Sequence, residues 1–313
     1  MSINQDTELV VVGFTGELKM LALQARSLAK YAEGAFTRIH YVVNDRDIRA
    51  FQRFFEDKIK PELGNLVSAV VVTPGDVVAG QKLKRTDWRS QQSLKLLAAR
   101  LVEAPQFLIL DSKNHFIRPV SNSTFVTDDG RMKTHRYGFN EKFRPKFENA
   151  CRYFGTPLPD EEFLALPTAT PFMMSTQQAR DLVSDVEARQ QTSFHSFFCG
   201  NKDYTEFYFY LAYLLSKAGL LEKLYQSRSR PQVTLFRSVT ENEKLLDDLL
   251  PVLDREDVYC FGVHRALAER YNPRVSAVVS QTWLRFGLVK DGQEAAYFLT
   301  PDVAKPKRWY WPF

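Results

Sequence analysis

Leu9-Val-Val-Val-Gly13 and Ile39-His-Tyr-Val-Val43 are the two apolar runs that decide the fold of this chain. Each run is short, continuous and followed by residues typical of turns, which is the pattern of a strand buried on both faces. Between them, residues 17–31 place apolar side chains at helical spacing, and Gly34 follows soon after. The pattern predicts a strand, a helix and a second strand in succession.

The alternation of strand and helix continues as far as residue 113. Residues 47–60 and 87–103 have the pattern of helices, and residues 66–72 and 107–110 have the pattern of buried strands. Strands that alternate with helices in this way are typical of a parallel sheet wound with helices. We therefore expect an α/β fold with a mostly parallel central sheet and a Rossmann-like N-terminal half. Ligands of such sheets bind beyond the carboxyl ends of the strands.

The second half of the chain is less regular. Helical spacing predicts helices over residues 139–154, 176–191 and 204–218, and residues 258–262 are strand-like. No internal repeat, low-complexity tract or obvious linker divides the sequence. We therefore expect one continuous domain.

The composition is that of an ordinary soluble globular protein, with 313 residues, 44% of them hydrophobic and 25% charged. No stretch approaches the roughly 20 uncharged apolar residues that span a bilayer. The segment from Met1 to Glu8 is polar and lacks the features of a secretory signal, so we expect a cytoplasmic protein. The net charge of +5 fits a polyanionic ligand or an anionic membrane surface, but it is too small and dispersed to indicate nucleic-acid binding.

Cysteines and isolated histidines offer no metal or disulfide pattern. Cys151, Cys199 and Cys260 lie far apart and are odd in number, so we expect them to be small buried apolar residues. His135 and His195 have no partner pattern and are expected in loops or at the surface.

One face of the helix predicted over residues 87–103 is polar. Trp88, Gln91, Gln92 and Lys95 share this face, because they are spaced i, i+3, i+4 and i+7. A face that packs on a sheet is normally apolar, whereas this one offers an indole, two amides and an ammonium group. Two interpretations remain: the face lines a ligand cleft, or it is a solvated face with Trp88 as a local anchor.

Asp111 directly follows the fourth predicted strand and precedes Ser112 and Lys113. A carboxylate at this edge of the sheet can bind a cation or a ribose hydroxyl. Aspartates are also common as turn residues at strand ends, so the position alone leaves a structural role open.

The order of residues in this region resembles that of a known family. The sequence has Trp-x-x-Gln-Gln-x-x-Lys-Leu over residues 88–96 and Leu-Asp-Ser-x-x-x-Phe-x-Arg-Pro over residues 110–119. Further similar segments are residues 9–31, Asp203-Tyr-Thr-Glu206 before Tyr210, and Phe261-Gly-Val-His264-Arg265. Together they resemble an uncharacterised bacterial glycosyltransferase-like family of the DUF6492 type, which is related to the GT-A nucleotide-sugar glycosyltransferases.

The resemblance implies a single GT-A-like domain over residues 1–313. Residues 1–120 would form its nucleotide-binding half, residues 121–304 its acceptor-binding half, and residues 305–313 an aromatic and basic tail. It also implies a nucleotide-sugar donor. The side chains expected to contact this donor are Thr15, Asn44, Trp88, Gln91, Gln92, Lys95, Asp111, Ser112, Lys113, His264 and Arg265.

A divalent metal is implied by the family but is put in doubt by one residue. In GT-A enzymes an Asp-x-Asp motif holds Mn²⁺ or Mg²⁺ against the diphosphate, and a late histidine often completes the metal shell. These roles would fall to Asp111 and His264. Lys113 stands where the family pattern has the second aspartate, and its ammonium group repels a nearby dication.

Two outcomes are compatible with this departure from the pattern. Asp111, His264 and the phosphates hold the metal while Lys113 turns away, or Lys113 replaces the metal and neutralises the leaving phosphate together with His264 and Arg265. We favour the second, in which the protein acts without a metal.

Glu206 is the preferred candidate for the base that takes a proton from the acceptor hydroxyl, and Asp203 is the second. Both positions also suit the beginning of the helix predicted over residues 204–218, because the helix dipole favours carboxylates there. The placement of these two acids is therefore open to a structural explanation.

The sequence thus predicts a glycosyltransferase that moves a sugar from a nucleotide-sugar donor to a bacterial polysaccharide or glycolipid. The alternative is a catalytically inactive nucleotide-sugar-binding relative with a regulatory or structural role. A nucleotidyltransferase is disfavoured, because such enzymes usually need two nearby carboxylates for paired metals.

The C-terminal segment mixes cations with aromatic residues. Trp309, Tyr310, Trp311 and Phe313 suit a bilayer interface, so the tail is expected either to make a peripheral contact with the inner membrane or to pack on the domain surface.

Overall fold

The computed structural model describes residues 6–66, 68–78, 83, 86–265, 267 and 272–302. Its central sheet has the strand order β3-β2-β1-β4-β7. The strands are β1 (Thr7–Gly13), β2 (Arg38–Val43), β3 (Ser68–Val72), β4 (Gln106–Asp111) and β7 (Phe172–Ser175). β1 pairs in parallel with β2 and β4, β2 pairs in parallel with β3, and only β7 is antiparallel to its neighbour β4. The prediction of an α/β fold with a mostly parallel sheet is therefore confirmed.

The N-terminal half follows the predicted alternation closely. Its helices are α1 (Leu18–Tyr31), α2 (Ile48–Phe54), α3 (Lys60–Leu63), α4 (Pro74–Val77) and α5 (Trp88–Leu97), with short 3-10 or π segments at Thr15–Glu17, Phe55–Ile59 and Ala98–Arg100. Asp47 caps α2 by accepting a hydrogen bond from the amide of Ala50 at 3.0 Å.

Two smaller sheets complete the described chain. One has the order β5-β10-β9, with β5 (Asn114–Phe116), β10 (Cys260–Val263) and β9 (Gln232–Leu235). The other pairs β6 (Met132–His135) with β8 (Tyr225–Arg228) in parallel. The remaining helices are α6 (Asn122–Phe125), α7 (Arg144–Phe154), α8 (Thr176–Gln190), α9 (Phe194–Gly200), α10 (Glu206–Leu215), α11 (Leu220–Leu224), α12 (Ser238–Glu241), α13 (Lys244–Leu249), α15 (Pro273–Arg285) and α16 (Gly292–Leu299), together with a 3-10 segment at Leu250–Asp254.

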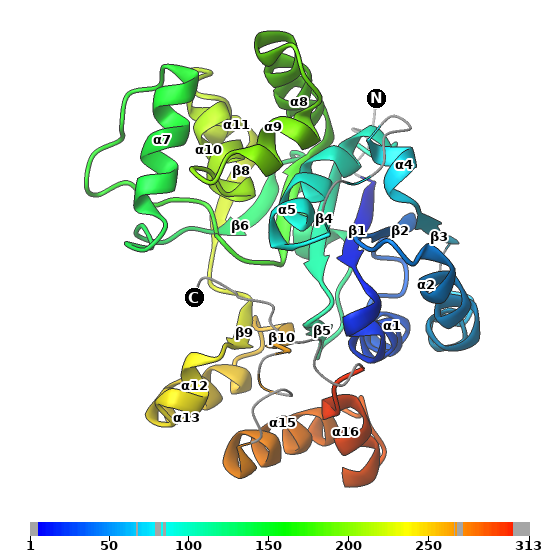
Figure 1. Cartoon of the computed structure of the whole chain (residues 1–313). Coiled ribbons are helices and arrows are strands. Elements are labelled where there is room, and N and C mark those ends of the chain that lie inside the picture. The colour runs from blue at the N-terminus through cyan, green and yellow to red at the C-terminus, as the bar shows by residue number, and fades with distance from the viewer. Residues whose placement is uncertain are drawn as a thin grey trace.

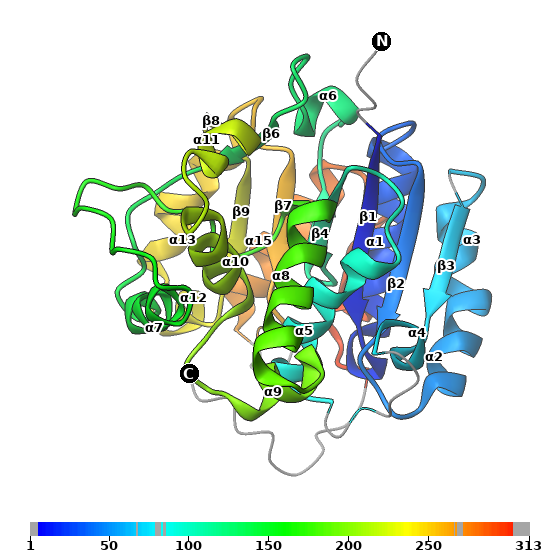
Figure 2. The ribbon, with the colours of Figure 1, turned by 90° about the horizontal axis from the view of Figure 1, so that it is seen from above.

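The elements form layers around the central sheet (Figure 1). Helices α5 and α8 cover one face of the sheet, and α1 lies on the other face, where the β5-β10-β9 sheet, α15 and α16 also gather (Figures 1 and 2). β1 is buried along its whole length, as expected of a strand covered on both faces.

Helix boundaries in the second half differ from the predicted ones by a few residues. α7 begins at Arg144 rather than near residue 139, and Pro145 occupies its first turn, where a proline is tolerated. α10 begins at Glu206 and ends at Leu215, inside the predicted range. The strands β7, β8 and β9 were missed, because their short sequences carry little periodic signal.

The histidine prediction was wrong. His135 lies in β6 and is 8% exposed, and His195 lies in α9 and is 4% exposed. The Nδ1 atom of His195 is 2.7 Å from the hydroxyl of Ser93 in α5. Both rings are therefore parts of the core and not surface residues. The cysteines are free and buried, as predicted.

None of the helices in the described part of the chain is both long and apolar enough to cross a membrane.

Candidate functional site

Three loops meet at the edge of the sheet where β1, β2 and β4 end. After β1 the chain passes through α1 to β2, which pairs with one side of β1. β4 comes later in the sequence and pairs with the other side of β1, so the order of the strands reverses direction between β1 and β4. Such a reversal of direction is the position where α/β sheets bind ligands. The amide of Thr15 donates to Asp45 at 3.1 Å, and its hydroxyl donates to the same carboxylate, so the loops after β1 and β2 are tied together.

Asn44 connects this edge to the beginning of α5. Its backbone amide donates to the carbonyl of Gly13 at 2.7 Å, and its side-chain amide donates to the carbonyl of Asp87 at 3.1 Å. The side-chain oxygen of Asn44 is buried and has no hydrogen-bond partner in the structure. An unused acceptor here suits a ligand donor, such as a base N–H.

Asp111 ends β4 and is held between two lysines. Lys95 Nζ lies 2.7 Å from one carboxylate oxygen, and Lys113 forms an ion pair with the other. Behind the turn, the side-chain amide of Gln24 donates to the carbonyls of Asp111 at 2.8 Å and Asn114 at 2.9 Å. Gln24 of α1 therefore fixes the turn that carries Asp111 and Lys113.

Lys95 also binds the acid that the sequence favours as base. Its ammonium group lies 3.2 Å from Glu206 Oε1, and the side chains of Lys95 and Glu206 are only 6% and 7% exposed. Glu206 stands in the first turn of α10, so this ion pair joins residues that are 111 positions apart in the sequence. Lys95 thus links the acid at the end of β4 with the acid at the beginning of α10.

The rest of the polar face of α5 is packed rather than solvated. Gln91 donates to the carbonyl of Val12 at 3.3 Å, at the end of β1, and Gln92 accepts from Arg89 at 3.1 Å. Gln92 is 1% exposed, and Trp88 is half-buried. The solvated-face interpretation is wrong, because this face packs against the rest of the protein. Lys95 contacts Asp111 and Gln91 ties α5 to the end of β1, whereas the bond of Gln92 lies within α5.

Glu17 is a site residue that the sequence analysis missed. It lies just after β1, and its carboxylate accepts a hydrogen bond from Ser112 at 2.7 Å. Burial raises the pKa of Glu17 and Asp111 raises it further, against the lowering effects of Ser112, Arg265 and Lys113. A glutamate in a short turn carries no distinguishing sequence pattern, so only the packing of this turn against Asp111 and Ser112 reveals it.

His264 and Arg265 follow β10 and reach the same site. The amide of Val263 donates to the carbonyl of Lys113 at 2.9 Å, which joins the end of β10 to the turn after Asp111. The guanidinium of Arg265 lies 5.1 Å from the ring centre of Phe14. The end of β10, the turn after β4 and the loop after β1 therefore converge, although they are far apart in sequence.

Electrostatics confirm that these groups share one environment. Burial raises the pKa of Asp111, but Lys113 and Lys95 outweigh burial and hold that pKa well below its usual range. Burial, Lys113 and Arg265 lower the pKa of His264 to about 4, with only Asp111 acting in the opposite direction. At neutral pH the site holds an ionised aspartate, a neutral histidine and several cations.

Asp203 lies outside this network. It is exposed in the loop before α10, where its backbone amide donates a hydrogen bond to Asn201 Oδ1 at 2.8 Å and its charge raises the pKa of Lys146 of α7. Of the two acids considered as base, the structure brings only Glu206 to Asp111. Trp309, Tyr310, Trp311 and Phe313 fall outside the described residues.

The fold and this site define an α/β protein with a charged centre at the carboxyl edge of its sheet. A family model described as "Family of unknown function (DUF6492)" matches residues 13–249. The chain belongs to this family. The match begins at the last residue of β1, includes β4 and Glu206, and ends before His264.

Several solved structures resemble the chain at low sequence identity. The apo form of mouse xyloside xylosyltransferase 1 is 13% identical, with a TM-score of 0.43, over 82% of this chain and 97% of that one. The galactosyltransferase LgtC, solved with donor and acceptor sugar analogues, is 13% identical, with a TM-score of 0.48, over 96% and 98% of the two chains. An active-site mutant of LgtC is 11% identical, with a TM-score of 0.46, over 82% and 87%. No curated protein sequence matches. Likeness at this level assigns no activity to the chain.

Proposed function

We propose that this protein is a glycosyltransferase that takes a sugar from a nucleotide-sugar donor and passes it to a glycan or glycolipid acceptor. The observation that carries this proposal is the convergence of Asp111, Lys113 and His264 at the carboxyl edge of the sheet, where the neighbouring strands β1 and β4 end. The topology favours ligand binding at this edge, and the cations Lys113 and Arg265 suit a diphosphate.

The parts of the donor would be bound by different loops. The unused oxygen of Asn44 and the Thr15–Asp45 pair lie at the ends of β1 and β2 and would meet the nucleoside. Lys113 and Arg265 would meet the diphosphate. Cations that are already in place stabilise the negative charge of the leaving nucleotide without reorganisation at the moment of reaction.

The side chains of this centre do not suit a divalent metal. A metal site needs several oxygen or nitrogen ligands free to coordinate. Both oxygens of Asp111 are engaged by Lys95 and Lys113, and no group of three or more His, Cys, Asp or Glu side chains able to hold a metal occurs among the described residues. Two ammonium groups beside the same carboxylate also repel a dication. We therefore propose action without a metal, with Lys113 in its place.

Glu206 is the group proposed to accept the proton of the acceptor hydroxyl. Glu206 is buried, and it lies near Asp111 because both acids bind Lys95. Burial also shelters it from water, which would compete as acceptor. Lys95 holds the carboxylate in a fixed direction through this ion pair. In this scheme Lys95 is a positioning residue and Glu206 the catalytic one.

Nucleotide binding is the direct test of the proposal. Calorimetric titration of the purified chain with UDP, GDP and CMP, each with EDTA and with Mn²⁺, should give saturable binding of at least one nucleotide in EDTA. Absence of binding to the whole panel in both conditions would remove the basis for a donor site.

A non-catalytic nucleotide-sugar-binding protein is the second candidate. The observation that favours it is the Lys95–Glu206 ion pair, because a carboxylate neutralised by an ammonium group is a weak base. Such a protein would bind the nucleotide but neither hydrolyse nor transfer the sugar of any donor that it binds.

The proposal extends to the acceptor and to the location of the protein. A bacterial polysaccharide or glycolipid acceptor would fit a cytoplasmic enzyme that touches the inner membrane through Trp309, Tyr310, Trp311 and Phe313. Sedimentation with anionic vesicles, compared between the full chain and a chain without residues 305–313, tests this contact. Equal sedimentation of both chains would rule out the tail as the anchor.

A further inference from the structure

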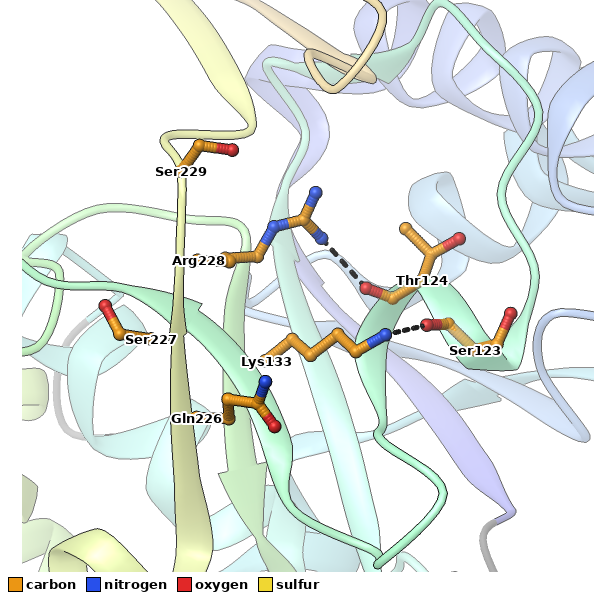
Figure 3. A pocket seen from close by; sticks show the side chains of 7 residues that line it. All are labelled: Ser123, Thr124, Lys133, Gln226, Ser227, Arg228 and Ser229. Carbon is orange, nitrogen blue, oxygen red and sulfur yellow. Dashed lines mark hydrogen bonds between the residues drawn. The ribbon is translucent and has the colours of Figure 1, made fainter.

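A polar groove, remote from the site at Asp111, lies between α6 and the β6-β8 sheet. Its volume is about 400 Å³. Figure 3 shows the side chains that line it, with Lys133 and Arg228 extending side by side from the two strands toward α6. The lining residues are Ser123, Thr124, Lys133, Gln226, Ser227, Arg228 and Ser229.

This groove is remote from Asp111. The hydroxyl of Thr7, at the beginning of β1, donates to Asn122 of α6 at 2.7 Å. In the pairing of β1 with β4, Thr7 lies opposite Gln106 and Val12 lies opposite Asp111. Five residues of strand separate the two ends, which is about 17 Å at the usual rise of a strand. Figure 2 likewise places α6, β6 and β8 at the end of the molecule where β1 begins.

The charges that line the groove have one sign. Lys133 and Arg228 are its charged residues, and none of the lining residues of the described chain is acidic. The nearby carboxylate of Asp257, which accepts from Ser229, is neutralised by Arg255 at 2.6 Å. The groove therefore presents an uncompensated positive charge together with hydroxyl and amide groups.

Both cations are held in place and still have donors to spare. Lys133 donates to the carbonyl of Ser123 at 2.7 Å, and Arg228 donates to the carbonyl of Thr124 at 2.9 Å (Figure 3). These bonds cap the end of α6 and explain why the side chains point across the groove. An ammonium group has three donors and a guanidinium five, so capping leaves several free to meet a ligand. Gln226 is exposed at the same wall.

The positive charges beside the groove also act on His135, a buried residue of β6. Burial lowers the pKa of His135 to about 4, and Arg230 and Arg228 add to this effect. His135 therefore stays neutral at physiological pH. The surroundings of the groove thus favour an anion.

We propose that this groove binds a phosphate group carried by a small molecule or by the acceptor, independently of the site at Asp111. Lys133 and Arg228 would donate charge-assisted hydrogen bonds to the phosphate oxygens, and Gln226 and Ser227 would add neutral donors.

The test uses inorganic phosphate and the full chain, followed by amide NMR at constant ionic strength. We expect saturable shifts of the amides of residues 123–124 and 226–229, with chloride at matched ionic strength giving none. The variant Lys133→Gln/Arg228→Gln should weaken the affinity at these amides at least tenfold. Lys60→Gln, which removes an exposed cation on another face, should leave the affinity unchanged.

Because Lys133 and Arg228 also cap α6, a second variant protects the test from misfolding. Gln226→Ala removes an exposed side chain and should weaken phosphate binding a few-fold with an unchanged thermal midpoint. Amides that do not shift, shifts that do not saturate, or equal binding by wild type and the double variant would overturn the proposal. Because the readout is local to the groove, it is independent of whether nucleotide binds at Asp111.

Discussion

The ammonium group of Lys95 lies 2.7 Å from Asp111 and 3.2 Å from Glu206, and all three side chains are largely buried. One lysine thus holds together the acid that ends β4 and the acid that begins α10. Burial lowers the pKa of Lys95, but Asp111 and Glu206 outweigh burial and raise it above its usual value. Lys95 is therefore charged at neutral pH.

Lys95→Met should destabilise the fold strongly, because it leaves Glu206 buried without its cation. Removing one partner of a buried pair costs about 3 kcal/mol or more. Urea unfolding measures the change, and Lys60→Met serves as the control, because its pair with Glu56 is exposed and is worth less than about 1 kcal/mol. A loss below about 1 kcal/mol for Lys95→Met would mean that the buried network contributes little to stability.

Lys113→Asp should create a metal site. The substitution supplies a second carboxylate beside Asp111 and removes the ammonium group that repels a dication. We expect Mn²⁺ binding, measured by electron paramagnetic resonance, in the variant but not in the wild type. Nucleotide affinity of the variant should become sensitive to EDTA.

Lys113→Gln is the matched control for that experiment, since it removes the charge without adding a ligand. It should bind nucleotide about 10-fold or more weakly, as expected for a lost charge-assisted contact, and should bind no Mn²⁺. If EDTA weakens nucleotide binding by the wild type, the proposed replacement of the metal by Lys113 is incorrect.

Glu206→Gln separates catalysis from binding. If Glu206 is the base, the transfer rate should fall by about 10²- to 10⁴-fold while the nucleotide affinity changes little. Asp203→Asn, which alters an exposed acid outside the network, should leave the rate unchanged. Equal rates for Glu206→Gln and wild type would assign the proton to another group, and the absence of any turnover in wild type would favour the binding protein.

His264→Gln should reduce the loss of stability between pH 6.5 and 4. The pKa of His264 is lowered from 6.5 to about 4 in the folded chain, so below pH 6.5 the unfolded chain takes up a proton that the folded chain does not. Protonation of His264 therefore costs no stability above pH 6.5 and lowers the free energy of unfolding as the pH falls toward 4. The pKa values of His115 and His135 are lowered to about 4 as well, so the variant should still lose stability at low pH, but less than the wild type.

Unfolding curves at several pH values give the size of this effect. The difference between wild type and His264→Gln should grow by about 3 kcal/mol across the window. A difference that stays constant with pH would show that His264 titrates normally in the folded chain.

The N-terminal fold could be predicted because local patterns specify it. The apolar run of β1 and the helical spacing of α1 are each contained in a few consecutive residues, and a buried parallel strand needs no other signal. Asp111 could be placed at the ligand edge for the same reason, since the end of β4 follows from the end of its apolar run.

The sequence by itself determined the α/β alternation, the position of Asp111 and the presence of Lys113 in place of a second acid. It did not determine that Lys95 is buried between Asp111 and Glu206, that Glu17 joins the site, or that β8 meets β6 beside α6 to form a cationic groove. Only the tertiary structure decided these, because each depends on contacts between segments far apart in the chain, where periodicity of neighbouring residues carries no information.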